Sequence, residues 1–210
     1  MVRTTGFYGR FAPYTGEPKF FDSVGSSTAL AATGTVNSTS INLVDQGNGE
    51  SQMVGRKITI KRITIRGNIS LPSQSNATFA NIPGSDTYRI CLVLDKQANG
   101  TAPTIATLFE DTDIRTHNDL ENSNRYTIMK EWKGSLSRTV IHDGTNYNAP
   151  DVDRYFKYNK ECNIPIEYGA MAGGSRVIGE VRSNNIGIVG FSASGTMTFT
   201  FRARIRYMDA

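Results

Sequence analysis

Two segments of the sequence carry most of its positive charge. Residues 51–72 hold five basic side chains and no acid, and residues 181–210 hold four basic side chains against one acid. Side chains gathered in this way can contact phosphate groups, which requires charge but no particular base sequence. They can equally be solvated residues on a sheet surface, or pair with acids of a neighbouring subunit such as those in 110–121. Since the net charge is only +4, its distribution is more informative than its total.

Catalytic and metal-binding chemistry has little support in the sequence. The two histidines, His117 and His142, have neither the spacing of a nucleophile elbow nor that of a zinc site. Asp111-x-Asp113 resembles the start of a calcium loop, but the positions at 115 and 116, which need an oxygen ligand and a glycine, hold arginine and threonine. We therefore expect no enzymatic activity, no metal ion and no cofactor.

Four aromatic residues could form a stacking platform for nucleic-acid bases. They are Trp132, Tyr155, Phe156 and Tyr158. Sandwich cores and subunit interfaces use the same residue types more often, so a place in the core or in an interface is the favoured interpretation.

The composition favours an all-β protein. The chain has 210 residues, 38% of them hydrophobic, and 20 glycines, with abundant serine, threonine and asparagine. No apolar run approaches the length of a membrane helix, so we expect no membrane insertion. Cys91 and Cys162 lie in strand-like runs, where a buried free thiol is expected more often than a disulfide.

The apolar periodicity predicts eight strands and one short helix. The clearest alternation places Arg202, Arg204 and Arg206 together on the polar face of a half-buried strand. In 56–71 the apolar phase changes from even to odd positions around Lys61–Arg62, which predicts a β-bulge there. The helix is expected at 103–109, and the strands at 56–71, 88–94, 125–132, 136–142, 153–162, 164–168, 185–193 and 196–207.

Several ordered segments resemble capsid proteins of the circular, replication-initiator-encoding single-stranded DNA viruses, the circovirus-like group. The resemblance spans most of the chain, and its specificity lies in the order of motifs that are individually weak. These are Arg3-Thr4-Thr5-Gly6-Phe7-Tyr8-Gly9-Arg10, Glu17-Pro18-Lys19-Phe20-Phe21-Asp22, Val54-Gly55-Arg56-Lys57-Ile58 with Ile65-Arg66-Gly67, Leu92-Val93-Leu94-Asp95-Lys96-Gln97 with Asn99-Gly100 and Ala102-Pro103-Thr104, Phe156-Lys157-Tyr158, and Arg204-Ile205-Arg206-Tyr207.

The resemblance implies an eight-stranded viral jelly-roll sandwich with BIDG and CHEF sheets, long loops and at most one or two short helices. Sixty copies would close a T=1 icosahedral shell around a single-stranded DNA genome. Strand 56–71 becomes B and strand 196–207 becomes I, so their polar faces would merge into one basic patch on the inner surface, with Lys130 and Lys133 of strand D at its edge. The candidate nucleic-acid-binding residues are Arg3, Arg10, Arg56, Lys57, Lys61, Arg62, Arg66, Arg202, Arg204 and Arg206.

The resemblance also implies a division into an N-terminal arm, residues 1–50, and a jelly-roll capsid domain, residues 51–210. Family members usually begin with an arginine-rich tail that condenses the genome and directs nuclear import, whereas here only Arg3 and Arg10 precede Lys19. The chain is then either truncated or naturally tail-less. The expected location is the virion, and assembly in the host nucleus would need an import signal supplied from elsewhere. The expected partners are further copies of the chain, packaged nucleic acid and a host receptor of unknown identity.

Two alternatives remain open on the sequence alone. The first is the capsid protein of a small RNA satellite virus, whose jelly roll would show a similar pattern. The second is a non-viral jelly-roll module that binds glycans.

Overall fold

The alternating sequence at the end of the chain forms a long strand near the centre of a five-stranded antiparallel sheet. In the computed structural model, which describes residues 18–37, 40–77 and 82–209, this sheet has the order β1-β12-β3-β9-β10. Its first and last members lie at the edges, and β12 and β3 pair along nearly their whole lengths. The strands are β1 (Pro18–Ala29), β12 (Thr198–Asp209), β3 (Lys57–Leu71), β9 (Val152–Tyr168) and β10 (Val181–Ser183).

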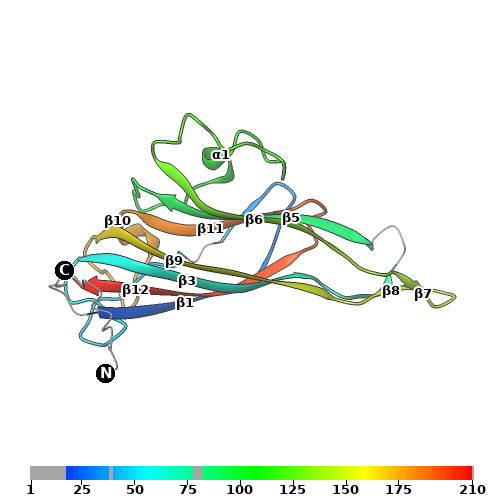
Figure 1. Cartoon of the computed structure of the whole chain (residues 1–210), viewed down its shortest axis with the longest axis horizontal. Coiled ribbons are helices and arrows are strands. Elements are labelled where there is room, and N and C mark those ends of the chain that lie inside the picture. Colours follow the sequence, from blue (N-terminus) through cyan, green and yellow to red (C-terminus); the bar gives the residue numbers. More distant parts are fainter. Residues whose placement is uncertain (1–17, 38–39, 78–81, 210) are drawn as a thin grey trace, which may run out of the picture.

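A second antiparallel sheet of four strands packs against the first, as Figure 1 shows. Its order is β2-β11-β5-β6. The central strand β5 is buried at nearly every position, as the apolar run at 88–94 predicted for a strand covered on both faces. The strands are β2 (Thr35–Val36), β11 (Asn185–Ser192), β5 (Ser85–Asp95) and β6 (Tyr126–Ser137).

Short elements complete the fold. A three-stranded sheet of β4 (Gln74–Ala77), β8 (Tyr147–Ala149) and β7 (Ile141–His142) extends one end of the molecule, away from the end of β12 (Figure 1). Helix α1 (Ile105–Leu108) lies in the long loop between β5 and β6, within the range where the sequence predicted a helix, and a 3₁₀ turn, η2 (Ile178–Glu180), precedes β10.

The hydrophobic core has two parts, one on each side of the four-stranded sheet. The larger cluster joins the facing sides of the two sheets, with Ile65 and Ile205 from one sheet and Ile90 and Ile188 from the other, all inaccessible to solvent. The smaller cluster includes Phe109 and other residues of the long loop that contains α1, packed over the far side of β5 and β11. This loop explains why β5 is buried on both faces.

The predicted β-bulge is confirmed. The β3–β9 register shifts between Ile60 and Arg62, and the β12 ladder shifts at the same place, between Arg206 and Tyr207. The extra residue changes which positions face the core, from Ile58 and Ile60 before the bulge to Ile63 and those that follow. Every isoleucine of β3 is therefore buried.

The fold class is confirmed as an all-β sandwich of jelly-roll type with few short helices, but three strand predictions are wrong in detail. The predicted strands 153–162 and 164–168 form one continuous strand, β9. Its proline, Pro165, lies where β9 has a free edge, because β10 pairs only with Glu167 and Tyr168. The predicted strand 136–142 is divided, since β6 ends at Ser137 and only Ile141–His142 forms β7.

The third correction concerns the strand that the sequence predicted at 125–132 and placed beside the basic strands. It is β6, and it lies in the other sheet, because it runs back along β5 after the long loop, with Lys133 opposite Arg89 and Lys130 opposite Leu92. The expectation that Lys130 and Lys133 border the basic patch is therefore wrong.

Part of the predicted N-terminal arm belongs to the sandwich. Residues 18–29 form β1, which pairs with β12, and Ile41 and Val44 are fully buried in the larger cluster. Both cysteines are free thiols. Within the described ranges, no helix is long and apolar enough to cross a membrane.

Candidate nucleic-acid interface

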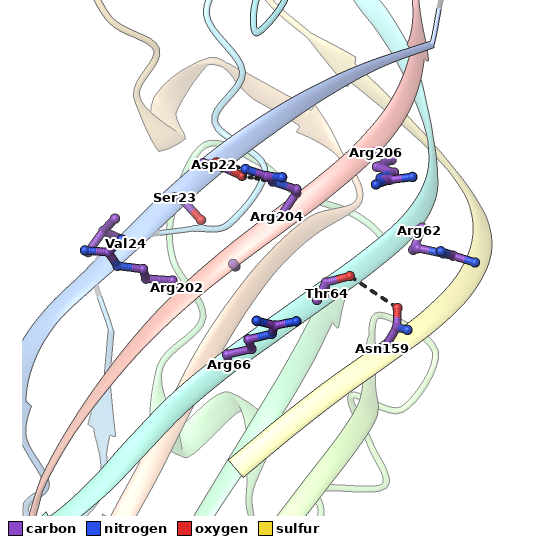
Figure 2. A pocket seen from close by; sticks show the side chains of 11 residues that line it. Asp22, Ser23, Val24, Arg62, Thr64, Arg66, Asn159, Arg202, Arg204 and Arg206 are labelled. Carbon is purple, nitrogen blue, oxygen red and sulfur yellow. Dashed lines mark hydrogen bonds and ion pairs between the residues drawn. The ribbon is translucent and has the colours of Figure 1, made fainter. Parts of the chain in front are cut away.

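The three arginines of β12 project from the outer face of the five-stranded sheet, the face that points away from the four-stranded sheet. Alternation along the strand buries Phe201, Ala203 and Ile205 against the core and exposes the arginines between and after them. Figure 2 shows these side chains together with those of the neighbouring strands β1, β3 and β9. They line a shallow hollow of about 480 Å³.

The most positive part of this face is a row of three basic side chains, which we call the basic row. Arg202 of β12 is directly opposite Arg66 of β3, and Arg66 is directly opposite Lys157 of β9. All three side chains are exposed. Within the described part of the chain none of them forms an ion pair, although the charge of Arg202 also contributes to lowering the pKa of Asp22 on β1. Like charges directly opposite one another destabilise a sheet, so the row favours a bound anion that neutralises it.

Arg204, in the next row, is already neutralised within the chain. Its Nε and Nη2 atoms each donate a hydrogen bond of 2.6 Å to the carboxylate of Asp22 on β1, and its guanidinium lies 4.8 Å from the ring centre of Phe20. The hydrogen bond from Arg204 holds the pKa of Asp22 below its ordinary value, and the same bond raises the pKa of Arg204. Of the three arginines of β12, Arg204 is thus the one with the least free charge.

The third row combines a paired and an unpaired arginine. Arg206 is opposite Arg62, which is opposite Glu161, and Arg62 donates a hydrogen bond to that carboxylate. Arg206 is exposed and has no ion-pair partner among the described residues. The hollow therefore carries two neutralised arginines, Arg62 and Arg204, and a surplus of charge at Arg66, Arg202, Arg206 and the adjacent Lys157.

The remaining predicted residues lie at the margins or outside the described chain. Lys57 forms an exposed ion pair of 3.5 Å with Glu167, and Lys61 donates a 2.5 Å hydrogen bond to Asn163. Arg56 is exposed just before β3. Arg3 and Arg10 lie outside the described residues. The structure thus brings together five of the ten predicted residues, namely Arg62, Arg66, Arg202, Arg204 and Arg206.

Sequence reasoning missed two residues that shape this site. In the sequence Lys157 belongs only to a family motif, and Asp22 lies in the segment predicted to be an N-terminal arm. Neither could be placed without the pairing of β3 with β9 and of β1 with β12, which joins segments far apart in the sequence. The alternation Tyr155, Lys157, Asn159 in β9 was a usable signal, because it puts Lys157 on a polar face.

The site is suited to holding phosphate groups. The strands that carry these guanidinium groups lie about 4.8 Å apart, and guanidinium groups recognise phosphate oxygens through charge and hydrogen bonds. In the described ranges no group of three histidine, cysteine, aspartate or glutamate side chains could hold a metal ion. Binding of a polyanion along the rows is the chemistry that the arrangement supports.

The four aromatic residues singled out in the sequence are separated by the structure. Trp132 of β6 packs against Phe156 and Tyr158 of β9, with ring centres 5.0 and 6.1 Å apart, so these three belong to the core between the sheets. This confirms the favoured interpretation for them. Tyr155 is different, since 60% of its surface is exposed.

Comparison with known proteins adds little. No family model matches the sequence, and no curated protein matches it. Among solved structures, the chain is similar to one described as the crystal structure of the 60-mer BFDV capsid protein, at 9% identity, over 92% of this chain and 93% of that chain, with a TM-score of 0.30. A likeness at this level carries no argument, so the functional inference depends on the residues of the chain itself.

Proposed function

We propose that the protein is the capsid subunit of a circovirus-like single-stranded DNA virus, with no catalytic role. Sixty copies assemble into a T=1 icosahedral shell, and the outer face of the five-stranded sheet turns toward the enclosed genome. The observation that carries the proposal is the basic row, which crosses the neighbouring strands β12, β3 and β9 of the five-stranded sheet.

The shell half of the proposal is supported by the ordered motifs together with the sandwich architecture. The segments that resemble strands B and I of the family form β3 and β12, and these two strands are hydrogen-bonded neighbours, as the BIDG order requires. Association of such subunits would bury apolar surface and cover free sheet edges, among them those of β1 and β6.

The packaging half is supported by the basic row, whose three side chains form no ion pair with an acid among the described residues. A phosphate backbone supplies one negative charge per nucleotide, and contact with it needs no base recognition, which suits a protein that encloses a whole genome. The cost of placing Lys157, Arg66 and Arg202 side by side is offset when phosphates lie over them.

Electron microscopy of the purified protein tests the shell. Closed particles of uniform size are expected, and small discrete oligomers would contradict assembly and favour the glycan-binding alternative. Treating intact particles with DNase and RNase and then extracting the protected nucleic acid separates a DNA genome from the RNA of a satellite virus.

Matched charge reversals test the packaging role. Arg202→Glu is expected to reduce the nucleic acid recovered per intact particle, because it places a carboxylate in the middle of the basic row. Lys130→Glu is the control, since Lys130 is also exposed but lies on β6 of the other sheet. Equal packaging by both variants in intact shells would remove the basic row from the proposal.

A further inference from the structure

Tyr155 is a large aromatic side chain that the core does not use. It lies on β9 between Arg154 and Phe156. Arg154 is exposed, whereas Phe156 is buried against Trp132. Its own surface is 60% exposed, and no hydrogen bond, ring contact or ion pair engages it within the described chain. Such a ring presents apolar surface to solvent, and a binding partner can cover that surface.

The position of Tyr155 relates it directly to the basic row. Tyr155 and Lys157 are two residues apart on β9, so they share the outer face, and Tyr155 is opposite Asn68 just as Lys157 is opposite Arg66. Diagonal neighbours in an antiparallel pair lie about 7 Å apart, within reach of long side chains. The ring therefore borders the row at the corner formed by Lys157 and Arg66.

We propose that Tyr155 stacks on a nucleic-acid base whose phosphate is held by the basic row, so that this face prefers single-stranded to double-stranded nucleic acid. The inference deepens the proposed function and rests on it. A single strand offers the flat faces of its bases to an aromatic ring, whereas a duplex keeps them stacked inside. Arginine and lysine alone would bind both forms through their phosphates.

The opposite corner of the outer face provides a contrast. Phe20 on β1 is 37% exposed, but the guanidinium of Arg204 already lies 4.8 Å from its ring centre. Part of that ring is therefore covered within the chain, and among the described residues of this face Tyr155 remains the aromatic side chain with an uncovered ring. Beyond Tyr155, the acidic Asp153 is opposite Ser70 and marks the end of the basic surface.

Oligonucleotide binding by the purified full chain tests the inference. The probes are a labelled oligothymidylate and a blunt DNA duplex with the same number of phosphates, each titrated over a range of salt concentrations. The variants are Tyr155→Ala, Tyr155→Phe and Arg202→Ala. Ile141→Ala, which removes an exposed apolar side chain from β7, is the control.

Each variant has a distinct expected result. Tyr155→Ala weakens oligothymidylate binding by about tenfold, leaves the duplex affinity unchanged and leaves the salt slope unchanged, because stacking releases no counterions. Tyr155→Phe retains the ring and binds as the wild type does. Arg202→Ala weakens binding of both probes and flattens the single-strand salt slope by about 0.7.

The outcomes that overturn the inference differ from those that overturn the proposed function. If Tyr155→Ala binds oligothymidylate as tightly as Ile141→Ala does, while Arg202→Ala is weakened, stacking is wrong and the basic row stands. If Tyr155→Ala loses the same affinity for both probes, the preference for single strands is wrong. If the wild type binds neither probe, or Arg202→Ala binds both unchanged, the packaging role itself fails.

Discussion

Arg66 of β3 and Arg202 of β12 stand directly opposite each other on the exposed face of the five-stranded sheet, and no acidic side chain among the described residues pairs with either. Opposed like charges cost a sheet on the order of 0.2–1 kcal/mol. The fold would be more stable if these two residues were apart or if each had an acidic partner, as Arg204 has in Asp22. The two opposed arginines therefore favour the binding of an anion to this face.

That preference predicts how anions change the stability of the protein. Arg202→Gln should leave the melting temperature unchanged or raise it by about 2 °C at low salt, because repulsion with Arg66 is removed. Inorganic phosphate, compared with chloride at equal ionic strength, should stabilise the wild type more than this variant, because it binds the folded row. Thermal unfolding followed by circular dichroism measures both effects. An equal response of the two proteins to phosphate would contradict phosphate binding at the row.

Asp22→Asn should have opposite effects on stability and on binding. The variant loses the ion pair with Arg204, which is about half exposed, so the fall in melting temperature at pH 7 should be at most about 2 °C. It also frees Arg204 for phosphate, so oligothymidylate binding should tighten, with a salt slope steeper by about 0.7. Fluorescence anisotropy measures the binding. Unchanged affinity would mean that Asp22 does not compete with phosphate.

The pH dependence of this variant has a definite sign. Because the pKa of Asp22 is lowered in the folded protein by its hydrogen bond to Arg204, the carboxylate stabilises the fold at pH values above its unfolded pKa of about 3.9. That contribution is lost as the pH falls through the lowered folded value. The stability difference between wild type and Asp22→Asn should therefore be present at pH 7 and vanish in strong acid. A difference that grows on acidification would contradict this assignment.

Gly67 has a structural role that the sequence does not reveal. A Cβ atom there would lie 2.3 Å from the ring of Phe156 and 2.5 Å from the carbonyl oxygen of Thr200, a backbone atom of the neighbouring strand. Gly67→Ala should therefore destabilise the protein by about 1–3 kcal/mol, as overpacking does. Gly187→Ala is the control, because a Cβ at that position meets nothing within 4 Å. Urea unfolding compares the two, and equal midpoints would show that the sheet adjusts without cost.

The sequence predicted those parts of the site that depend on local periodicity. The alternation around Arg202, Arg204 and Arg206 placed all three on one exposed face, and the change of phase at Lys61–Arg62 located the bulge. Both signals arise within one strand, where the side chains alternate with a period of two.

The parts that could not be predicted depend on which strands become neighbours. The resemblance to a family supplied the pairing of β3 with β12, which is correct, but it also placed Lys130 and Lys133 beside them, which is wrong. The partners Asp22 and Lys157 are set by the registers of β1 and β9, which no local pattern specifies. Whether an arginine is free or neutralised is therefore a property of the assembled sheet.

We predict that Arg89 stabilises the packing of the acidic loop 110–121 against the sandwich. Its buried guanidinium donates hydrogen bonds of 2.6 Å to Glu131 and to the carbonyl oxygen of Thr116, and it lies 4.8 Å from the ring centre of Phe109. Arg89→Met keeps the apolar stem but leaves these acceptors without their donor, so a loss of about 3 kcal/mol is expected. Amide exchange in the loop should accelerate more than exchange in β12.

Arg115→Ala provides the control for the loop prediction. Arg115 pairs with Asp113 inside the same loop, and 88% of its side chain is exposed, so its removal should change neither global stability nor exchange measurably. Hydrogen–deuterium exchange with mass spectrometry resolves the loop from the strands. If Arg89→Met and Arg115→Ala leave the protection of 110–121 equal, the loop is held by the packing of Phe109 on Phe191 and not by the buried charge.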